Sequence, residues 1–353
     1  MARDRGRDPV GARVAGIELA AGAVRAVVAR AEGGRLHVLG RGELGLRADA
    51  IVGGLVVDRP TVSGALAGAL AAAERAVPAE RAVLAIDGDD VRTYHVMTSF
   101  ERAQSTSAIA RAEVERALRE ARADAAQHAG REVDDDPALR GVATARLADS
   151  VAALVLDGRP LESLIGYHGR SLDIHTDVAV APLVLSGAAL ATIAASRRRA
   201  TAISGIYALA RLVAGSGIAD AGIVRLGADV TAVAIVRERR VVGTRVFGLG
   251  RDALAQRSET RDQDATVWAE CVAAPLDGHD APPPERWLFV GVPDTMLALP
   301  SALAATLGEA RGGATRMGPL SAGVVSRVFA DTPLQGEDLV AVGAAFVGAE
   351  ADE

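Results

Sequence analysis

The sequence predicts an α/β fold made of two similar halves, with an insertion inside the first half. The stretch AGIELAAGAVRAV, which begins at Ala15, returns in similar form as AGIVRLGADVTAV, which begins at Ala221. Each copy reads as an apolar strand, a tight turn of small residues and a second apolar strand. An internal repeat of this kind indicates a duplication. With 353 residues, the chain is long enough for a duplicated domain.

The first half opens with three strands joined by two tight turns, at residues 13–19, 23–30 and 35–41. A helix rich in Ala and Leu is expected to begin after Pro60 and to end at Pro78. A short buried strand follows at 81–87, so this half reads as β-β-β-α-β. Its helical pattern resumes at Ala188 and is expected to run through the stretch YALARLVAGSG.

A different pattern interrupts the first half. Residues 91–100 form an expected strand, and the long helix that follows has one apolar face and is expected to stop at Gly130. The acidic run from Asp134 to Asp136 is expected to lie in a solvated loop. Two alternating stretches, VATARLADSVAALVLDG and RSLDIHTDVAVAP, predict further strands. We interpret this strand–helix–strand–strand block as the insertion.

The second half repeats the opening pattern, with strands expected at 221–226, 230–237 and 240–247. A helix that contains Trp268 follows, and then the loop DGHDAPPPE. A last strand and turn, RWLFVGVPDTM, precede a helix through LPSALAATLG. Both halves are therefore expected to consist of a sheet with helices.

Composition excludes several classes of protein. The net charge of −6 argues against a general nucleic-acid binder, which would usually present a basic face. The single cysteine, Cys271, excludes an internal disulfide framework and a cysteine-based zinc site, and it is expected to be a buried small hydrophobic residue. The six histidines are scattered, and no pair has the spacing of metal ligands. Only 3% of the residues are aromatic, so Ala, Val, Leu and Ile are expected to build the core.

No stretch of the sequence approaches the roughly 20 apolar residues that a membrane span requires. The basic start, MARDRGRDPVGA, is not followed by the apolar region of a signal peptide. The acidic end, GAEADE, does not form a basic amphipathic anchor. We therefore expect a cytoplasmic protein with no membrane anchor in the chain itself.

Four stretches resemble the actin-like ATPases, and specifically their bacterial FtsA and PilM branch. They are GIELAAGAVRAVVA and IVRLGADVTAVAIV at the two phosphate loops, IVGGLVVDRPTVSGALAGALAAAERA before the first long helix, and VLDGRPLESLIGYHGRSLDIHTDV in the insertion. Ordinary actins and DnaK-type chaperones lack an insertion at this point, whereas FtsA and PilM carry one. Within the branch, VLDG and GRSLDIHT look more like FtsA.

The resemblance implies duplicated actin-like domains of ribonuclease-H-like fold, and it divides the chain into five parts. The expected parts are a disordered basic tail (1–12), actin-like domain I (13–86 and 179–217), an inserted subdomain (87–178), a shortened actin-like domain II (218–348) and an acidic tail (349–353).

In this family each phosphate loop carries an Asp that orients magnesium or the attacking water, and glycines that let backbone N–H groups approach the phosphates. Here the acid of the first loop is Glu18, and Ala20 and Ala21 stand where the family has Gly and Ser or Thr, so only Gly22 keeps backbone freedom. The acid of the second loop is replaced by Arg225, which cannot coordinate a metal. The second turn retains Gly227, Asp229 and Thr231.

The remaining nucleotide-binding positions implied by the resemblance are Gly248 and Gly250, in the turn GLG, and Gly291, in the turn VGVPDTM. The short span between Gly250 and Trp287 implies that a subdomain which supplies one wall of the adenine pocket is largely deleted. Glu18 and Arg225 are expected to face one another across the two halves and to form an ion pair. The sequence thus predicts a pseudo-ATPase without a cofactor, with ATP and magnesium binding as the alternative.

Asp87 and Asp89 flank Gly88 and are interpreted only as turn residues. No other constellation of catalytic residues is found in the sequence.

The favoured hypothesis is an FtsA-like scaffold of cell division that acts by protein–protein contact, with 91–100 and 165–178 as candidate surfaces. The alternative is a PilM-like cytoplasmic adaptor of a pilus or secretion apparatus. The third hypothesis is an active ATPase or a sugar-kinase relative. The partners expected are proteins of the division or pilus machinery, self-association is an open alternative, and a partner would recruit the chain to the inner face of the membrane.

Overall fold

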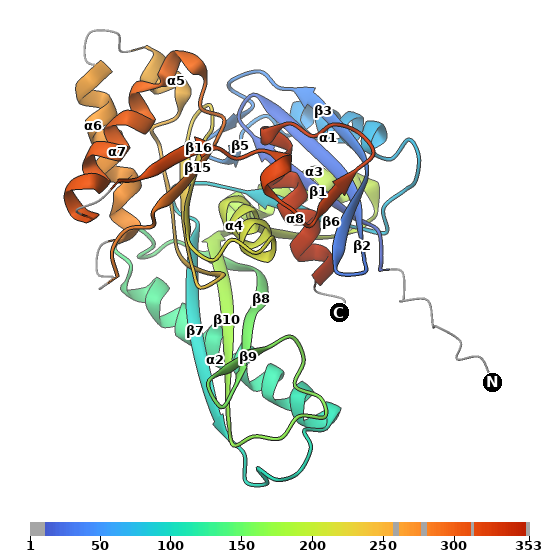
Figure 1. Ribbon diagram of the computed structural model, residues 1–353. Coiled ribbons are helices and arrows are strands. Elements are labelled where there is room, and N and C mark those ends of the chain that lie inside the picture. Colours follow the sequence, from blue (N-terminus) through green and yellow to red (C-terminus); the bar gives the residue numbers. More distant parts are fainter. Residues whose placement is uncertain (1–10, 257–260, 277–280, 312–313, 351–353) are drawn as a thin grey trace. The chain divides into compact units, whose positions relative to one another are not determined.

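The computed structural model describes residues 11–256, 261–276, 281–311 and 314–350 (Figure 1). The chain divides into two compact units. Unit 1 combines Met1–Val91 with Val184–Glu353, and unit 2 is Arg92–Leu183. The inserted part was expected over 87–178, so its observed bounds lie further along the chain. The shift arises because residues 87–91 stay with unit 1 while the last strand of unit 2 continues to Pro182.

The first sheet of unit 1 has six strands in the order β11-β6-β1-β2-β3-β17. Its central strand, β1, pairs antiparallel with β2 and parallel with β6, and it is buried along almost its whole length. The strands are β1 (Val14–Ala20), β2 (Ala23–Glu32), β3 (Arg35–Gly45), β6 (Arg81–Ile86), β11 (Arg199–Ser204) and β17 (Val328–Ala330). A two-stranded ribbon, β4 (Ile51–Val52) and β5 (Leu55–Val56), precedes the first helix.

Two helices pack on this sheet: α1 (Arg59–Ala73) on β2 and β3, and α8 (Leu339–Glu350) on β1, β2 and β6. Helix α3 (Leu183–Ile193) precedes β11, and α4 (Gly205–Gly215) follows it and contacts strands of both large sheets of unit 1. Helix α1 begins at Arg59, slightly earlier than the expected start after Pro60, because the Asp58 carboxylate accepts a hydrogen bond from the backbone N–H of Thr61 (3.2 Å) and Pro60 lies in the first turn. Helix α8 is buried on nearly all sides and packs against β1, β2 and α4. No described helix is both long and apolar enough to span a membrane.

The second sheet has five strands in the order β14-β13-β12-β15-β16. Its strand β12 pairs antiparallel with β13 and parallel with β15, just as β1 pairs with β2 and β6. The strands are β12 (Ala221–Leu226), β13 (Thr231–Arg237), β14 (Arg240–Phe247), β15 (Arg286–Val290) and β16 (Arg316–Pro319). This shared pairing confirms the duplicated α/β fold that the repeat predicts.

Helices α5 (Arg251–Ala255) and α6 (Arg261–Ala273) lie between β14 and β15 in the chain, and α7 (Ala298–Arg311) lies between β15 and β16. The two tryptophans of the chain, Trp268 and Trp287, are fully buried in the core between α6, α7 and this sheet. Cys271 in α6 is half-buried, so the expectation of a fully buried thiol is wrong. The residues of this helix that face the core are instead Ala265, Trp268 and Val272.

Three helix boundaries differ from the sequence prediction. Helix α1 ends at Ala73 and not at Pro78. The helical pattern from Ala188 is not continuous, because Arg197 adopts a left-handed backbone conformation (φ 54°) and the chain forms β11 before α4. The helix of unit 2 does not stop at Gly130 but continues to Asp135, since Val133 packs into the core of that unit. Asp136 then pairs with Arg92 (2.9 Å) instead of lying in a solvated loop.

The end of the chain also differs from expectation, since 218–348 was assigned to the second half. Strand β17 pairs with β3, and α8 packs on β1, so this segment returns to the first sheet. The approach of α8 to β1 is so close that a Cβ atom on Gly16 would lie 2.0 Å from the carbonyl oxygen of Ala341. An apolar helix of this kind is stable only where both of its sides are covered.

Unit 2 is a four-stranded antiparallel sheet in the order β7-β10-β8-β9, with one long helix on it. The helix, α2 (Arg111–Asp135), places a row of alanines against the sheet, and these small side chains allow close approach. The alanines are Ala117, Ala121, Ala125 and Ala129, and the strands are β7 (Arg92–Glu101), β8 (Thr144–Leu156), β9 (Arg159–Leu161) and β10 (Ser171–Pro182).

Asp157 holds the turn between β8 and β9. Its backbone is left-handed (φ 47°), and its carboxylate accepts hydrogen bonds from the backbone N–H groups of Ser171 (2.8 Å) and Arg170 (3.0 Å). These two backbone bonds lower the pKa of Asp157 below its ordinary value of 3.8. A carboxylate with a lowered folded-state pKa stabilises the fold above its ordinary pKa, and this contribution disappears as the pH falls through the folded value.

The variant Asp157→Asn is therefore expected to unfold at a lower urea concentration than the wild type at pH 7. Asn tolerates the left-handed backbone, so the loss reports on the hydrogen bonds and the charge. The difference should shrink as the pH is lowered below 3.8. Urea unfolding followed by circular dichroism at both pH values tests this, with the exposed Asp134→Asn as control. An equal deficit at both pH values would contradict the expectation.

Candidate functional site

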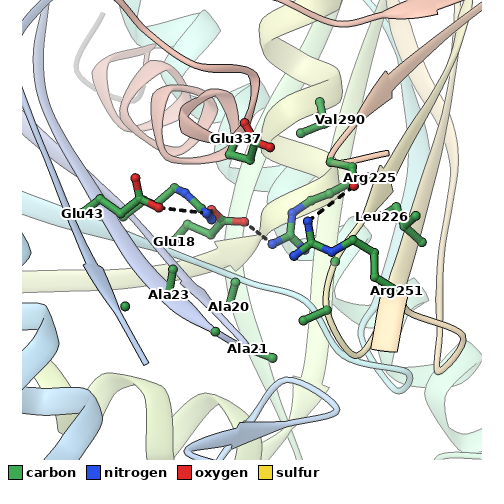
Figure 2. Close-up of a pocket in the computed structure, with 16 residues that line it drawn as sticks. Glu18, Ala20, Ala21, Ala23, Glu43, Arg225, Leu226, Arg251, Val290 and Glu337 are labelled. Atoms are coloured by element: carbon green, nitrogen blue, oxygen red, sulfur yellow. Dashed lines mark hydrogen bonds and ion pairs between the residues drawn. The ribbon is translucent and has the colours of Figure 1, made fainter. Parts of the chain in front are cut away.

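A cavity of about 200 Å³ lies in unit 1, where the turn between β1 and β2 faces the loop after β12 (Figure 2). Side chains and backbone from both halves line it. Its lining residues are Glu18, Ala20, Ala21, Gly22, Ala23, Arg25, Glu43, Gly45, Arg225, Leu226, Gly227, Ala228, Arg251, Val290, Gly291 and Glu337. The two loops are the ones that the repeat places at equivalent positions in the two sheets.

A buried ion pair joins the two halves at this cavity. The guanidinium Nη2 of Arg225 donates to Glu18 Oε1, and only 2% of Glu18 and 7% of Arg225 are exposed (Figure 2). The second oxygen of Glu18 accepts from Arg25 Nη1 at 3.1 Å. The ion pair that the sequence predicts between Glu18 and Arg225 is thus confirmed.

The pair extends into a ladder of alternating charges across the first sheet. The strand register places Glu18 opposite Arg25 and Arg25 opposite Glu43. Arg25 accordingly lies 3.0 Å from Glu43, which also contacts Arg41 at 3.1 Å. Cross-strand pairs of opposite charge stabilise a sheet. The sequence analysis did not identify Arg25 or Glu43, although counting outward from the two hairpin turns would have placed them opposite one another.

Asp87 lies at the other side of the same guanidinium. Its Oδ2 is 3.8 Å from Arg225 Nη1, and its Oδ1 accepts a hydrogen bond from the backbone N–H of Ile206, in the first turn of α4 (3.0 Å). Burial raises the pKa of Asp87 above its ordinary value of 3.8, against the opposing effect of Arg225 and the Ile206 N–H. Sequence reasoning had interpreted Asp87 as a turn residue only, and its role in a buried charge cluster was missed.

Five of the nine residues expected at a nucleotide site line the cavity: Glu18, Gly22, Arg225, Gly227 and Gly291. Gly22 and Gly291 have left-handed backbones (φ 89° and 76°), which glycine adopts without strain. Gly227 closes a tight turn by donating its N–H to the carbonyl of Val230 (2.8 Å).

The other four expected residues do not line the cavity, and they make contacts around the second loop instead. Asp229 accepts from the N–H of Gly53 (2.7 Å), and buried Thr231 donates to the carbonyl of Leu249 (2.6 Å) while accepting from Trp268 Nε1 (3.0 Å). Gly250 donates its N–H to Asp229 (3.1 Å), and a Cβ on Gly250 would lie 2.4 Å from the carbonyl oxygen of Ala228. Gly248 lies beside the Asp89 carboxylate.

The charged residues that line the cavity balance one another. The acids are Glu18, Glu43 and Glu337, and the bases are Arg25, Arg225 and Arg251. Arg251, at the start of α5, contacts the carbonyl of Gly291 at 3.5 Å. Within the described parts of the chain, no group of three or more His, Cys, Asp or Glu side chains is placed to hold a metal ion.

No protein-family model matches this sequence, and no curated protein sequence does either. Solved structures are similar in fold. The PilM–PilN type IV pilus biogenesis complex aligns with a TM-score of 0.57 at 15% identity, over 95% of this chain and 98% of that chain. A Bacteroides thetaiotaomicron protein of actin-like ATPase fold aligns with a TM-score of 0.45 at 8% identity, over 87% and 90%. The cytoplasmic domain of EpsL, from the type II secretion system of Vibrio cholerae, gives 0.40 at 10% identity, over 95% of each chain. The first of these alignments shows that this chain shares the fold of the PilM–PilN structure, in agreement with the duplicated actin-like fold that the sequence predicts.

Proposed function

We propose that this protein is a PilM-like adaptor of a type IV pilus or secretion apparatus, which acts by protein–protein contact and does not hydrolyse ATP. The observation that carries this proposal is the buried contact between Glu18 and Arg225, at the point where the two loops of an actin-like ATPase would meet the phosphates. A binding role that needs no turnover is consistent with loops already joined by an ion pair.

The charge of the cavity supports the absence of turnover. Each guanidinium near the β1 loop already faces a carboxylate, and the cavity lining has as many acids as bases. ATP with its several negative charges would have to displace Arg225 from Glu18 and would bring Glu18 and Glu43 near the phosphates. Breaking a buried pair is costly because it leaves an uncompensated charge.

The similarity in fold to PilM supports the choice of apparatus. That alignment covers nearly the whole of both chains, so it includes the inserted unit as well as the two halves. The sequence motifs VLDG and GRSLDIHT favoured an FtsA-like division scaffold, which remains the second candidate. In either role the protein would act by binding another protein, and that partner would recruit it to the inner face of the membrane.

Titration with ATP or ADP, with and without magnesium, is expected to show no saturable binding up to millimolar nucleotide and no release of phosphate. We expect this result because Arg225 is already paired with Glu18 and because acidic and basic residues of the cavity lining are equal in number. Isothermal calorimetry and thermal shift measure nucleotide binding, and a phosphate-release assay measures hydrolysis. Magnesium-dependent binding with a sub-millimolar dissociation constant, or steady phosphate release, would refute the pseudo-ATPase part of the proposal.

Deleting the gene in its source bacterium separates the two candidate machineries. We expect the deletion strain to lose surface pili or secretion of the cognate substrate while its cell length stays normal. Complementation with the wild-type gene should restore the phenotype and serves as the control. Filamentous cells with normal pili and secretion would instead support the division scaffold.

A further inference from the structure

The strand β7 forms a long open edge of the sheet in unit 2 (Figure 1). It spans ten residues and shows no register shift along its pairing with β10, and no other strand among the described residues pairs with it. Between its terminal residues, Arg92 and Glu101, the sequence TYHVMTSF contains no proline, no glycine and no Lys, Arg, Asp or Glu. An edge of this kind is a template for pairing with another strand.

The other sheet edges in the described parts of the chain are shorter or interrupted. Strands β9 and β17 have three residues each, and β16 has four, which end in Gly318 and Pro319. Strand β14 carries Gly243 and Arg245, and its pairing with β13 contains a register shift. Strand β11 has six residues, of which the last three are buried, and the strands of the ribbon β4–β5 have two residues each. Charges, proline, bulges and shortness are the features by which proteins protect sheet edges, and the stretch of β7 from Thr93 to Phe100 has no Lys, Arg, Asp, Glu or proline and no bulge.

The backbone groups on the outer side of β7 can be assigned from the ladder. Arg102 donates its N–H to the carbonyl of Arg170 (2.8 Å), so residues of even number point toward β10. The N–H and C=O groups of the odd-numbered residues therefore point away from the sheet. These residues are Thr93, His95, Met97, Ser99 and Glu101. Met97, at the middle of the strand, is 57% exposed and is therefore accessible to a partner strand.

We infer that β7 pairs with β7 of a second copy of this chain, antiparallel and centred on Met97, to give one continuous eight-stranded sheet in a symmetric dimer. In this register Met97 meets its own copy, His95 meets Ser99, and Thr93 meets Glu101. On the other face, Tyr94 meets Phe100 and Val96 meets Thr98. Every pair between Thr93 and Glu101 is thus apolar, polar or hydrogen-bonding, and no like charges meet.

Strand β7 can pair with a second copy of itself because residues at equal distances on either side of Met97 are similar in polarity. A two-fold axis makes an interface self-complementary, since each contact occurs twice. The flanking Arg92 and Arg102 would lie opposite one another, but each is already neutralised, by Asp136 (2.9 Å) and Glu113 (2.7 Å) respectively. The dimer goes beyond the proposed adaptor role and does not depend on it.

The test begins with the mass of the full-length protein in solution, measured by light scattering after size exclusion and by analytical ultracentrifugation. The wild type is expected to be a dimer at micromolar concentration. Met97→Lys places two like charges opposite one another at the centre of the interface and is expected to raise the dissociation constant at least about tenfold. The matched control is Val52→Lys in β4, which also replaces an exposed apolar residue (54% exposed) and should leave the dimer intact.

A cysteine scan tests the register itself in a Cys271→Ser background. Opposed residues in an antiparallel pair have Cα atoms about 5.5 Å apart, within disulfide range. Met97→Cys is therefore expected to cross-link readily under mild oxidation. Ser99→Cys would lie about 14 Å from its own copy, at four residues and about 3.4 Å per residue, and should not cross-link. Circular dichroism confirms that each variant is folded.

Three results would overturn the inference. The first is a wild-type monomer at 100 µM or above, including one in which β7 instead binds an extended segment of another protein. The second is a dimer that persists in Met97→Lys or is lost in Val52→Lys. The third is cross-linking of Ser99→Cys as efficient as that of Met97→Cys. Loss of the adaptor function in cells with an intact dimer would leave this inference standing, so the two proposals fail separately.

Discussion

Replacing Arg225 with methionine is expected to lower the free energy of unfolding by about 3–5 kcal/mol, the range measured when one partner of a buried ion pair is removed. The side chain lies between two buried carboxylates, Glu18 and Asp87, and it contacts both. Methionine has a comparable volume but cannot compensate either charge. Chemical denaturation followed by circular dichroism measures the loss.

The control for Arg225→Met is the double variant with Glu18→Leu. Removing both partners takes both charges out of the interior, and replacing a buried pair by apolar residues is often neutral or stabilising. The double variant should therefore recover the part of the loss that comes from Glu18, while Asp87 still lacks Arg225 and Arg25 keeps its contact with Glu43. A single variant as stable as the wild type would show that the pair does not hold the two halves together.

The pH dependence of Arg225→Met provides a second readout of the same cluster. Burial already raises the pKa of Asp87 above 3.8, and loss of Arg225 removes the group that opposes this rise. A carboxyl with a raised folded-state pKa stays protonated in the fold while it ionises in the unfolded chain. Stability therefore falls as the pH rises between the ordinary pKa and the folded value. The variant is expected to lose stability more steeply than the wild type above pH 3.8.

The second large effect is expected from Gly16→Ala. Gly16 lies in β1 beneath α8, and an added Cβ would be 2.0 Å from the carbonyl oxygen of Ala341 and 2.5 Å from the backbone nitrogen of Ala345. Both neighbours are backbone atoms of a buried helix, so the helix as a whole must move. Overpacking of this kind costs roughly 3 kcal/mol or more where the structure cannot relax. Thermal and chemical unfolding measure the loss.

Gly64→Ala is the matched control for Gly16→Ala. Gly64 lies on the exposed face of α1, and an added Cβ there has no neighbour within 4 Å. Alanine is favoured over glycine inside a helix by about 0.8–1 kcal/mol, so this variant is expected to be slightly more stable than the wild type. Equal effects of the two substitutions would mean that the close packing of α8 on β1 is not what Gly16 provides.

Local patterns in the sequence predicted most of the elements. Alternating apolar runs and tight turns placed β1 and β2, and Pro60 placed the start of α1. The repeat predicted that β12 would correspond to β1, and therefore that Glu18 and Arg225 would face one another. These features were readable because strand periodicity, turn residues and capping residues act over a few neighbouring positions.

Long-range packing decided the rest. The return of α8 to the first sheet depends on an uncovered surface formed by residues some 300 positions earlier in the chain, so no local pattern in α8 reports it. The same holds for the charge cluster: Arg25 and Glu43 meet only because three strands pair in one register, and Asp87 acquires its raised pKa only because the folded chain buries it. By itself the sequence determined the duplicated fold and the ion pair between equivalent strands. Only the tertiary structure decided which residues share the cavity and which strand edge stays open, because burial and register belong to segments that meet only after folding.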